Sequence, residues 1–526
     1  MRKRAVTLYI VICVCFMALT LRIIEINTRM YSDASQSQQT KTIEIGTSRG
    51  KIYDRNLELL VDTKERLIAA VTPAKSVAEI SEFTLSTQEI EEKLESAKPF
   101  SAEVTSEINN ELIRTFSVPV RYSDSCACHL VGYLDSTNQN GLSGIEKAYN
   151  SYLKENSGSL SVSFEVDAYD RALVGLDKII NDNNYCSKAG VVLTIDRNIQ
   201  QIVENALQNS TVKSGCAAVM HIDSGEIYAS ASVPVYDRND VAKSLNEDNS
   251  PLVNKLLQSY CVGSVFKPII AAAALESGIS EETVFECTGS VTVGDTVFKC
   301  YDEKAHGKQT MTEALQNSCN TYFINLINEM NTDYLLSICR SLGFSSETEI
   351  ADGITAAKGL LPQNSELKNA GEKANFSFGQ GTLLATPVQM LAAYHALASG
   401  NYIKPTVIKG TVDSSLLLKE KEQNQSNKIF SDETVIKMRC MLSDVVESGN
   451  ASKAKSDLMM LAGKTGTAQS GIFENSKEIC RTWFVGFFPA NNPHYVVVIL
   501  NEDGTSGSSD CAPVFKEICE GIALSQ

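Results

Sequence analysis

The stretch that decides the fold is residues 260–278, which read YCVGSVFKPIIAAAALESG. Its four alanines and its leucine are strong helix formers, and Gly278 suits the end of a helix. Because Pro268 has no N–H group, a helix tolerates it only in the first turn, so this helix is predicted to begin at about Ser264. Ser264 and Lys267 then share one face of the opening turn, with the hydroxyl within reach of the amine.

A serine and a lysine in this position are suited to nucleophilic catalysis. The unpaired N–H groups and the partial positive charge at a helix N-terminus stabilise a developing oxyanion and favour a neutral lysine. We therefore predict Ser264 as the nucleophile and Lys267 as its base. The S-x-x-K spacing alone is weak evidence, because it occurs five more times in the chain. Ser264 differs in having a glycine before it and an apolar helix after it.

Two shorter patterns further along the chain have chemistry that fits this pair. Ser318-x-Asn320 follows a predicted helix, and a K-T-G-T run at residues 464–467 precedes two predicted strands. The edge of such a strand can pair with an extended peptide, its lysine and threonines can hold a carboxylate, and its glycine permits close approach. S-x-N also occurs at four other places, among them Ser448, so the tripeptide alone is not specific.

The region from about residue 189 onward combines strand and helix patterns. Two apolar runs joined by Ser224-Gly225 predict a hairpin, and a second strand pair is predicted near the C-terminus. Because strands at both ends of the region enclose long helical patterns, we predict an α+β fold with one antiparallel sheet packed against helices. The predicted strands are residues 191–195, 217–223, 226–232, 482–488 and 495–500.

The N-terminal residues have the pattern of a membrane anchor. Arg2, Lys3 and Arg4 precede 17 uncharged and mostly apolar residues that end at Leu21. As a helix this run spans about 25 Å, slightly less than a hydrocarbon core of about 30 Å, and no small-residue cleavage site follows it. We therefore predict an uncleaved, single-pass anchor with its N-terminus in the cytoplasm and the rest of the chain outside the cell membrane.

The three motifs occur in a characteristic order along the chain. Ser264-x-x-Lys267, Ser318-x-Asn320 and then Lys464-Thr-Gly resemble the penicillin-binding transpeptidase domain, which is shared in outline with the serine β-lactamases. Other stretches similar to that family are His306-Gly307 and residues 378–390 and 483–489.

The upstream sequence also resembles one branch of this family. Residues 49–56 and 141–146 are similar to the pedestal of class B, monofunctional penicillin-binding proteins of the division and sporulation type without C-terminal PASTA domains. Leu57 stands where that pattern usually has glycine, which affects a turn and not the catalytic motifs. The charged segment 80–117 within this region is predicted to be mostly helical.

The resemblance implies a fold and a domain order. The fold is an antiparallel sheet sandwiched by helices, preceded by an elongated pedestal and one transmembrane helix. The expected domains are a cytoplasmic tip and transmembrane anchor over residues 1–24, a stalk over 25–45, a dimerisation-type pedestal over 46–188 and the transpeptidase domain over 189–526.

The resemblance also implies a substrate, the cell-wall stem peptide that ends in D-Ala-D-Ala, and a role for each motif. Lys267 takes the proton of Ser264, which attacks the penultimate carbonyl; Ser318 relays a proton to the leaving amine; Asn320 orients Lys267 and the substrate. The remaining roles belong to the K-T-G-T run: Lys464 supports Ser318, Thr465, Gly466 and Thr467 bind substrate, and the N–H groups of Ser264 and Thr467 form the oxyanion hole.

The expected partners follow from the same likeness. They are peptidoglycan stem peptides, β-lactam antibiotics, a SEDS-type glycan polymerase and other membrane proteins of the division or elongation complex. No cofactor and no metal are expected, and the net charge of −16 makes a nucleic-acid partner improbable. Division, elongation and sporulation all remain open as the process served.

Two other functions are compatible with the motifs. A β-lactamase or a β-lactam-sensing receptor would share Ser264, Lys267 and Lys464, but efficient hydrolysis needs a dedicated base for water that the sequence does not single out. A non-catalytic scaffold of the division or elongation complex is the second alternative, against which the intact set of motifs argues.

The 15 cysteines are an odd number and are spread along the chain, which excludes a compact disulfide scaffold. Cys287 and Cys300 flank a predicted hairpin and are the first candidates for a disulfide. Cys126, Cys128 and His129 have the spacing of half a metal knuckle, which without a second half is a weak signal.

Overall fold

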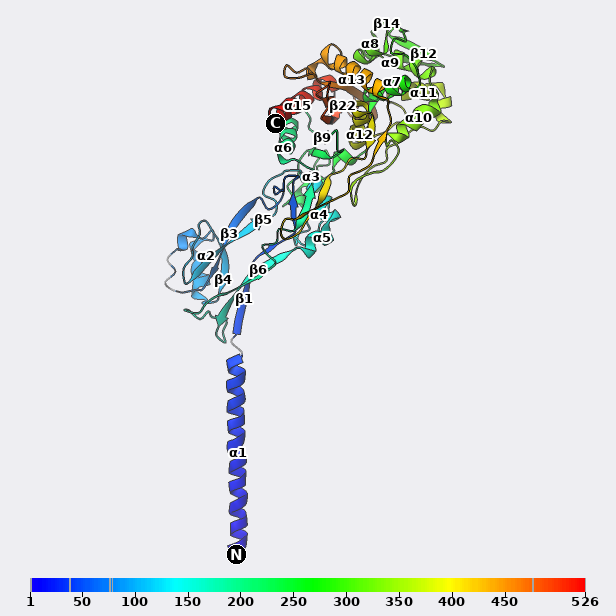
Figure 1. Cartoon of the computed structure of the whole chain (residues 1–526). Coiled ribbons are helices and arrows are strands. Elements are labelled where there is room, and N and C mark those ends of the chain that lie inside the picture. The colour runs from blue at the N-terminus through cyan, green and yellow to red at the C-terminus, as the bar shows by residue number, and fades with distance from the viewer. Residues whose placement is uncertain (1, 37–38, 75–76, 78, 475–476, 526) are drawn as a thin grey trace. The chain divides into compact units, whose positions relative to one another are not determined.

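The computed structural model of the chain describes residues 2–36, 39–74, 77, 79–474 and 477–525 (Figure 1). Its residues form two compact units, and each unit combines segments that are far apart in the sequence. The first unit comprises Met1–Arg49, Lys64–Val120 and Ser157–Ser187; the second comprises Gly50–Thr63, Arg121–Asn156 and Lys188–Gln526. The division into residues 1–24, 25–45, 46–188 and 189–526 stays a prediction.

The described part of the first unit contains two antiparallel three-stranded sheets, ordered β1-β6-β7 and β4-β3-β5. Apolar side chains such as Val118, Val162 and Phe164 are buried in one of its cores. Its elements are α1 (Arg2–Gln36), β1 (Gln39–Ser48), β3 (Lys64–Val71), η1 (Ile80–Glu82), α2 (Thr87–Glu95), β4 (Phe100–Val104), β5 (Ile113–Val120), β6 (Gly158–Val166) and β7 (Ile179–Asn183).

The prediction that residues 80–117 are mostly helical is wrong. Only η1 and α2 are helical there, and α2 begins at a capping box in which Ser86 and Glu89 bond each other's backbone N–H groups. Residues 100–104 alternate between buried and half-buried, which is the period of a strand. The run of glutamates in α2 supplied a helical charge pattern that the flanking sequence does not share.

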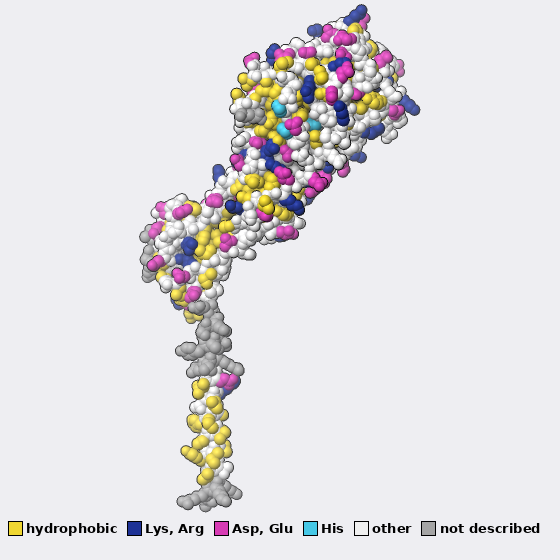
Figure 2. Space-filling model, in the orientation of Figure 1, with side chains coloured by type: hydrophobic (Ala, Val, Ile, Leu, Met, Phe, Trp, Pro, Cys, Tyr) yellow, Lys and Arg dark blue, Asp and Glu magenta, His cyan; other side chains and the backbone are white. Residues whose placement is uncertain are grey.

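Helix α1 exposes a continuous series of large apolar side chains between Val6 and Ile24 (Figure 2). A helix was expected at this place and is present. When length and apolar character are taken together, however, none of the helices in the described part of the chain qualifies as a membrane span.

The described core of the second unit is a five-stranded antiparallel sheet ordered β10-β9-β23-β22-β21, which confirms the α+β prediction. Both predicted strand pairs are present. β9 and β10 consist almost wholly of buried residues, as expected for strands covered by helices on both faces. The strands are β9 (Gly215–His221), β10 (Ile227–Val233), β21 (Ala462–Glu474), β22 (Lys477–Phe488) and β23 (Tyr495–Gly504).

Four long helices contact this sheet (Figure 1). The helix α6 packs against α15, the last helix of the described chain, so the two ends of this region meet. The other two helices also contact each other. These helices are α6 (Arg197–Gln208), α15 (Ala512–Ser525), α12 (Pro387–Ser399) and α13 (Asp432–Glu447).

A group of buried elements next to this sheet carries the first two predicted motifs, and β21 of the sheet carries the third. A 3₁₀ turn, η4 (Gly263–Phe266), leads directly into α7 (Lys267–Glu276), with Pro268 in its first turn, so the predicted start at about Ser264 is confirmed. Residues 267–274 of α7 are all buried, which makes α7 a core helix. Two neighbours of α7 are α8 (Met311–Gln316) and α9 (Asn320–Asn328).

The remaining elements are short. A four-stranded sheet is ordered β19-β18-β8-β2, and the other short strands pair as β11-β14, β12-β13, β15-β16 and β17-β20. The strands are β2 (Lys51–Tyr53), β8 (Gly190–Leu193), β11 (Phe285–Cys287), β12 (Ser290–Val293), β13 (Thr296–Lys299), β14 (Gly307–Gln309), β15 (Thr348–Ala351), β16 (Ile354–Ala356), β17 (Asn401–Ile403), β18 (Ile408–Val412), β19 (Leu418–Glu420) and β20 (Ser426–Lys428). The helices are α3 (Cys128–Val131), α4 (Gly144–Ala148), α5 (Asn150–Glu155), η2 (Val241–Asn246), η3 (Lys255–Leu257), η5 (Tyr301–Glu303), α10 (Thr332–Ser341), η6 (Glu366–Lys368), α11 (Ala370–Ser377), η7 (Ser452–Ala454) and α14 (Gly507–Asp510).

The packing of β22 on α15 predicts a large loss of stability on truncation. Phe484 and Phe515 are fully buried, with ring centroids 4.3 Å apart. Phe484→Ala is expected to lower the free energy of unfolding by about 3–5 kcal/mol, because it removes a buried ring and leaves a cavity. Phe473→Ala, at an exposed ring of β21, is the control and should change it by less than about 0.5 kcal/mol. Equal losses in chemical denaturation would contradict this packing.

Candidate functional site

The predicted nucleophile, Ser264, lies half-buried in the turn η4. The glycine before it has a positive φ of 60°, and its N–H donates to the carbonyl of Gly379 at 2.9 Å. A Cβ at Gly263 would lie 3.0 Å from the carbonyl oxygen of Thr467. Both the backbone conformation and the close approach of β21 therefore require glycine at this position.

The predicted base, Lys267, is fully buried and its amine makes three hydrogen bonds. The Nζ atom donates to the carbonyl oxygen of Ser318 at 2.6 Å, to the Ser318 Oγ at 3.2 Å and to the Asn320 Oδ1 at 2.7 Å. Burial lowers the pKa of Lys267 to about 8, and the nearby thiols of Cys319 and Cys300 act in the opposite direction. At pH 7 about one tenth of this lysine is therefore neutral, a far larger share than for an ordinary lysine, which suits a general base.

The Ser318-x-Asn320 motif lies at the junction between α8 and α9. Ser318 has a φ of 51°, a left-handed conformation that is unfavourable for a side chain and is typical of functional sites. Asn320 accepts a hydrogen bond from Lys267 with its Oδ1 and donates one through Nδ2 to the carbonyl of Lys299 at 2.9 Å. The amide of Asn320 is therefore fixed in one orientation from both sides.

Lys464 on β21 is fully buried close to this group. Its Nζ donates to the Asn450 Oδ1 at 3.4 Å and to the Thr465 carbonyl at 3.2 Å. Burial, followed by the positive charge of Lys267, lowers the pKa of Lys464 well below its ordinary value. Lys267 is therefore close enough for its charge to favour the neutral form of Lys464.

The strand β21 that carries the K-T-G-T run is the last strand in the order of the sheet. A Cβ at Gly466 would lie 2.9 Å from the carbonyl oxygen of Val262, so β21 passes directly beside the η4 turn. The hydroxyl of Thr465 donates to Asn450 at 3.2 Å, and that of Thr467 accepts from the N–H of Gly507 at 3.3 Å. This geometry brings the third motif beside the first.

The structure thus brings together all eight residues predicted for the site, with one difference from the expected contacts. Among the hydrogen bonds of the described residues, none joins the hydroxyl of Ser264 to the amine of Lys267; the amine bonds Ser318 and Asn320 instead. Catalytic hydrogen bonds are often long before substrate binds, so this difference does not remove Lys267 from its role.

One residue of the site, Asn450, was missed from the sequence, whereas a second, Gly379, lies in the stretch 378–390 whose resemblance was noted. Asn450 accepts from both Lys464 and Thr465, although Ser448-x-Asn450 is one of the four other S-x-N tripeptides. Gly379, with a φ of 79°, bonds Gly263 at the start of the nucleophile turn. The glycines on both sides of Gln380 were a sequence signal for a tight turn, whereas nothing in the local sequence marks Asn450.

The two cysteines that were the first candidates for a disulfide are free. The sulfurs of Cys287 and Cys300 are 3.7 Å apart, which is beyond bonding distance. The predicted hairpin between them is present as β12 and β13. In the other cysteine pattern, the Nε2 of His129 and the carbonyl oxygen of Pro251 are 2.7 Å apart, and Cys128 donates to Tyr236.

Comparison with known proteins gives consistent matches. Residues 215–520 match the family model described as "Penicillin binding protein transpeptidase domain". "Peptidoglycan D,D-transpeptidase MrdA" of Acinetobacter baumannii is 26% identical over 91% of this chain and 81% of its own length. "Stage V sporulation protein D" of Bacillus subtilis is 31% identical over 74% of this chain and 61% of its own length.

A solved structure described as "Complex between Penicillin-Binding Protein (PBP2) and MreC from Helicobacter pylori" contains a similar chain. The likeness has a TM-score of 0.66 at 23% identity and covers 93% of this chain and 99% of that chain. At this identity it concerns the fold. With the family match, it confirms the transpeptidase fold expected from the sequence.

The contact between Gly379 and Gly263 predicts a steric effect. A Cβ at Gly379 would lie 2.1 Å from the carbonyl oxygen of Gly263, so Gly379→Ala is expected to lower the free energy of unfolding by about 1–3 kcal/mol more than Gly278→Ala. Gly278 is a matched control, because it also has a positive φ but no atom within 4 Å of the added Cβ. Equal losses in thermal denaturation would show that this contact is not tight.

Proposed function

The chain belongs to the penicillin-binding protein transpeptidase family, and from this premise we propose that it is a class B peptidoglycan D,D-transpeptidase. It cross-links stem peptides through a serine acyl-enzyme, releases terminal D-Ala and binds β-lactams covalently. The observation that carries the proposal is the convergence on one site of Ser264, the hydrogen-bonded group of Lys267, Ser318 and Asn320, and the strand bearing Lys464.

Acylation begins with a neutral amine beside the nucleophile. Lys267 takes the proton of Ser264 as the Oγ atom attacks the penultimate carbonyl carbon. A bond forms between Oγ and that carbon, and the bond from the carbon to the nitrogen of terminal D-Ala then breaks. The proton passes from Lys267 through Ser318, whose hydroxyl is 3.2 Å from the amine, to the departing nitrogen.

The tetrahedral intermediate needs hydrogen-bond donors for its oxyanion. The backbone N–H groups of Ser264 and Thr467 are the proposed donors, and the close approach of β21 to the η4 turn supports this pairing. Loss of one such donor typically lowers the rate by about 100–1,000-fold. The free edge of β21 gives an extended peptide a place to pair, with Thr465, Gly466 and Thr467 along it.

The second half of the reaction transfers the acyl group to another stem peptide. The amine of that peptide attacks the ester carbon and gives a proton to the neutral Lys267. A new amide forms as the bond from that carbon to the Ser264 Oγ breaks, and Lys267 returns the proton to the Oγ atom. The hydrogen bonds recorded for Lys267, Ser318 and Lys464 in the described part of the chain include no carboxylate partner. A base of the kind that activates water in an efficient hydrolase is therefore not among these partners, which favours a transpeptidase over a β-lactamase.

The setting of the reaction is also part of the proposal. The exposed apolar side chains of α1 support attachment to the cell membrane through that helix, with the catalytic unit outside the cell. The likeness to a chain solved in complex with MreC supports an assembly with membrane proteins of elongation or division, including a SEDS-type glycan polymerase.

The nucleophile is tested by covalent labelling. Ser264→Ala is expected to reduce labelling by a fluorescent penicillin by at least about 1,000-fold, because no hydroxyl remains to form the ester. Ser452→Ala is the matched control, since Ser452 belongs to another S-x-x-K tetrapeptide but is exposed, and it should label normally.

Three results would contradict the proposal. Undiminished labelling of Ser264→Ala would exclude this serine, and rapid turnover of penicillin would favour a β-lactamase. Full support of growth by Ser264→Ala, in cells that depend on this chain, would favour a scaffold.

The pH dependence of acylation follows from Lys267. Its pKa is lowered to about 8 in the folded protein, so the amine is protonated below this pH and neutral above it. The rate of penicillin acylation is therefore expected to rise by about tenfold per pH unit below pH 8 and to level off above it. Lys267→Arg should abolish the rise, because arginine stays protonated. A rate that falls through pH 8 in stopped-flow measurements would contradict Lys267 as the base.

A further inference from the structure

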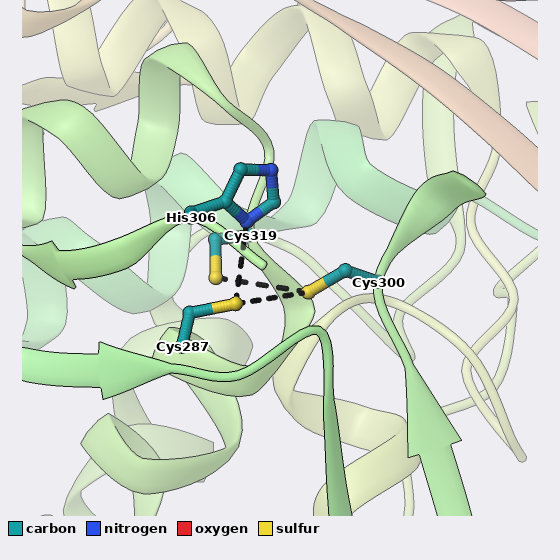
Figure 3. Close-up of side chains that lie close together, drawn as sticks. All are labelled: Cys287, Cys300, His306 and Cys319. Atoms are coloured by element: carbon teal, nitrogen blue, oxygen red, sulfur yellow. Dashed lines mark hydrogen bonds between the residues drawn. The ribbon is translucent and has the colours of Figure 1, made fainter. Parts of the chain in front are cut away.

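Three cysteines and one histidine converge beside the Ser318-x-Asn320 motif (Figure 3). Cys287 ends β11, Cys300 follows β13, His306 precedes β14 and Cys319 is the residue before α9. The Sγ atoms and a ring nitrogen of His306 all lie within 4.8 Å of one another, and the three cysteines are buried. It is the one such group found among the described residues.

Three of the six separations between these atoms are close to those of a tetrahedral metal site. With Zn–S bonds of about 2.3 Å and a Zn–N bond of about 2.0 Å, neighbouring sulfurs lie about 3.8 Å apart and sulfur and nitrogen about 3.5 Å apart. The observed distances are 3.7 Å for Cys287 to Cys300, 3.8 Å for Cys300 to Cys319 and 3.3 Å for Cys287 to the His306 Nδ1. A disulfide needs about 2.05 Å, and all these cysteines are free.

We propose that Cys287, Cys300, His306 and Cys319 bind one zinc ion in a closed, four-coordinate site. Three soft thiolates and an imidazole at tetrahedral spacing favour zinc among the common metals. With four protein ligands the ion has no open position, so its role is structural. The three thiols lose their protons to solvent as the ion binds.

The surrounding hydrogen bonds suit thiolate ligands. The N–H of Gly289 donates to the Cys287 sulfur at 3.4 Å, and the hydroxyl of Thr321 lies 3.2 Å from the Cys319 sulfur. Donors of this kind orient metal-bound sulfur and stabilise its charge.

The segment that supplies the ligands has little else to hold it in place. Among the residues whose burial is described between 285 and 309, only Cys287, Gly289, Cys300 and Gln309 are buried. The short strand pairs β11-β14 and β12-β13 therefore lack an apolar core of their own. Small structures of this kind are commonly held by a metal or a disulfide, and here the disulfide is absent.

The ion would also position the catalytic asparagine, a consequence that depends on the proposed function. Cys319 lies between Ser318 and Asn320 in the sequence, and Lys299, whose carbonyl accepts from Asn320, precedes Cys300. Both ends of this hydrogen bond are thus adjacent to metal ligands. Asn320 in turn accepts a hydrogen bond from the amine of Lys267 at 2.7 Å. The ion would therefore fix the position of Lys267 indirectly, through Cys319 and Asn320.

Metal content tests the site independently of activity. The full-length protein, purified with a reducing agent and without chelator, is incubated with zinc sulfate, dialysed and analysed for zinc, iron, copper and nickel. We expect about one zinc per chain, with an X-ray absorption signature of three sulfurs at about 2.3 Å and one nitrogen at about 2.0 Å. Cys300→Ser and His306→Ala should each weaken zinc binding by at least about tenfold against a chromophoric chelator. Cys440→Ser, at an exposed cysteine of α13, is the matched control and should bind normally.

Four outcomes would contradict the zinc site. The first two are a zinc content below about one-tenth per chain in the unsubstituted protein and equal zinc binding by all variants. The other two are a Cys287–Cys300 disulfide in the reduced preparation and another metal bound in stoichiometric amount.

The positioning role has its own readout. Removal of zinc with a chelator should lower the rate of penicillin acylation by at least about tenfold, and added zinc should restore it. If zinc binds with the expected ligands but its removal leaves the acylation rate unchanged, the positioning role is wrong and the metal site stands. If no form of the protein reacts with penicillin while zinc still binds, the proposed function fails and the metal site again stands.

Discussion

The site depends on the buried amine of Lys267. An amine without access to water needs hydrogen-bond acceptors and loses part of its tendency to be charged. Here Ser318 and Asn320 supply the acceptors, and the same burial lowers the pKa of Lys267 to about 8. The buried position in which Ser318 and Asn320 bind the amine is thus also the position that lowers its pKa and allows it to accept a proton.

The need to bind this buried amine explains backbone conformations that would be unfavourable on their own. Ser318 adopts a left-handed backbone conformation, which presents both its carbonyl and its hydroxyl to the amine. Gly263 and Gly379 accept positive φ values and a close contact, which allow β21 to lie beside the nucleophile turn. Lys464 is buried near Lys267, whose charge adds to the effect of burial in lowering the pKa of Lys464.

Much of the fold and the site could be predicted from the sequence, because the decisive signals are local. Pro268 and the alanines determine where α7 begins, and apolar runs separated by turn signals predict the strands of the central sheet. Contacts between distant segments could not be predicted in this way. Asn450 reaches Lys464 across 14 positions of the chain, and its tripeptide is identical in pattern to others outside the site.

The four proposed metal ligands illustrate the same limit. They are separated by 12, 5 and 12 residues, so they form no compact C-x-x-C unit, and two of them suggested a disulfide instead. The β12-β13 hairpin brings Cys287 near Cys300, the pairing of β11 with β14 brings in His306, and Cys319 comes from the start of α9. The charged pattern of residues 80–117 was misleading because of a local signal. The strong helical pattern of α2 was extended to the residues that follow it, which form the strands β4 and β5.

The central claim is that Ser264 forms the covalent bond. Peptide mapping by mass spectrometry, after reaction of the full-length protein with benzylpenicillin and proteolysis, tests it most directly. The account predicts a penicilloyl adduct confined to the peptide that contains Ser264. An adduct on Ser318, on Cys261 or on any other residue in its place would contradict it.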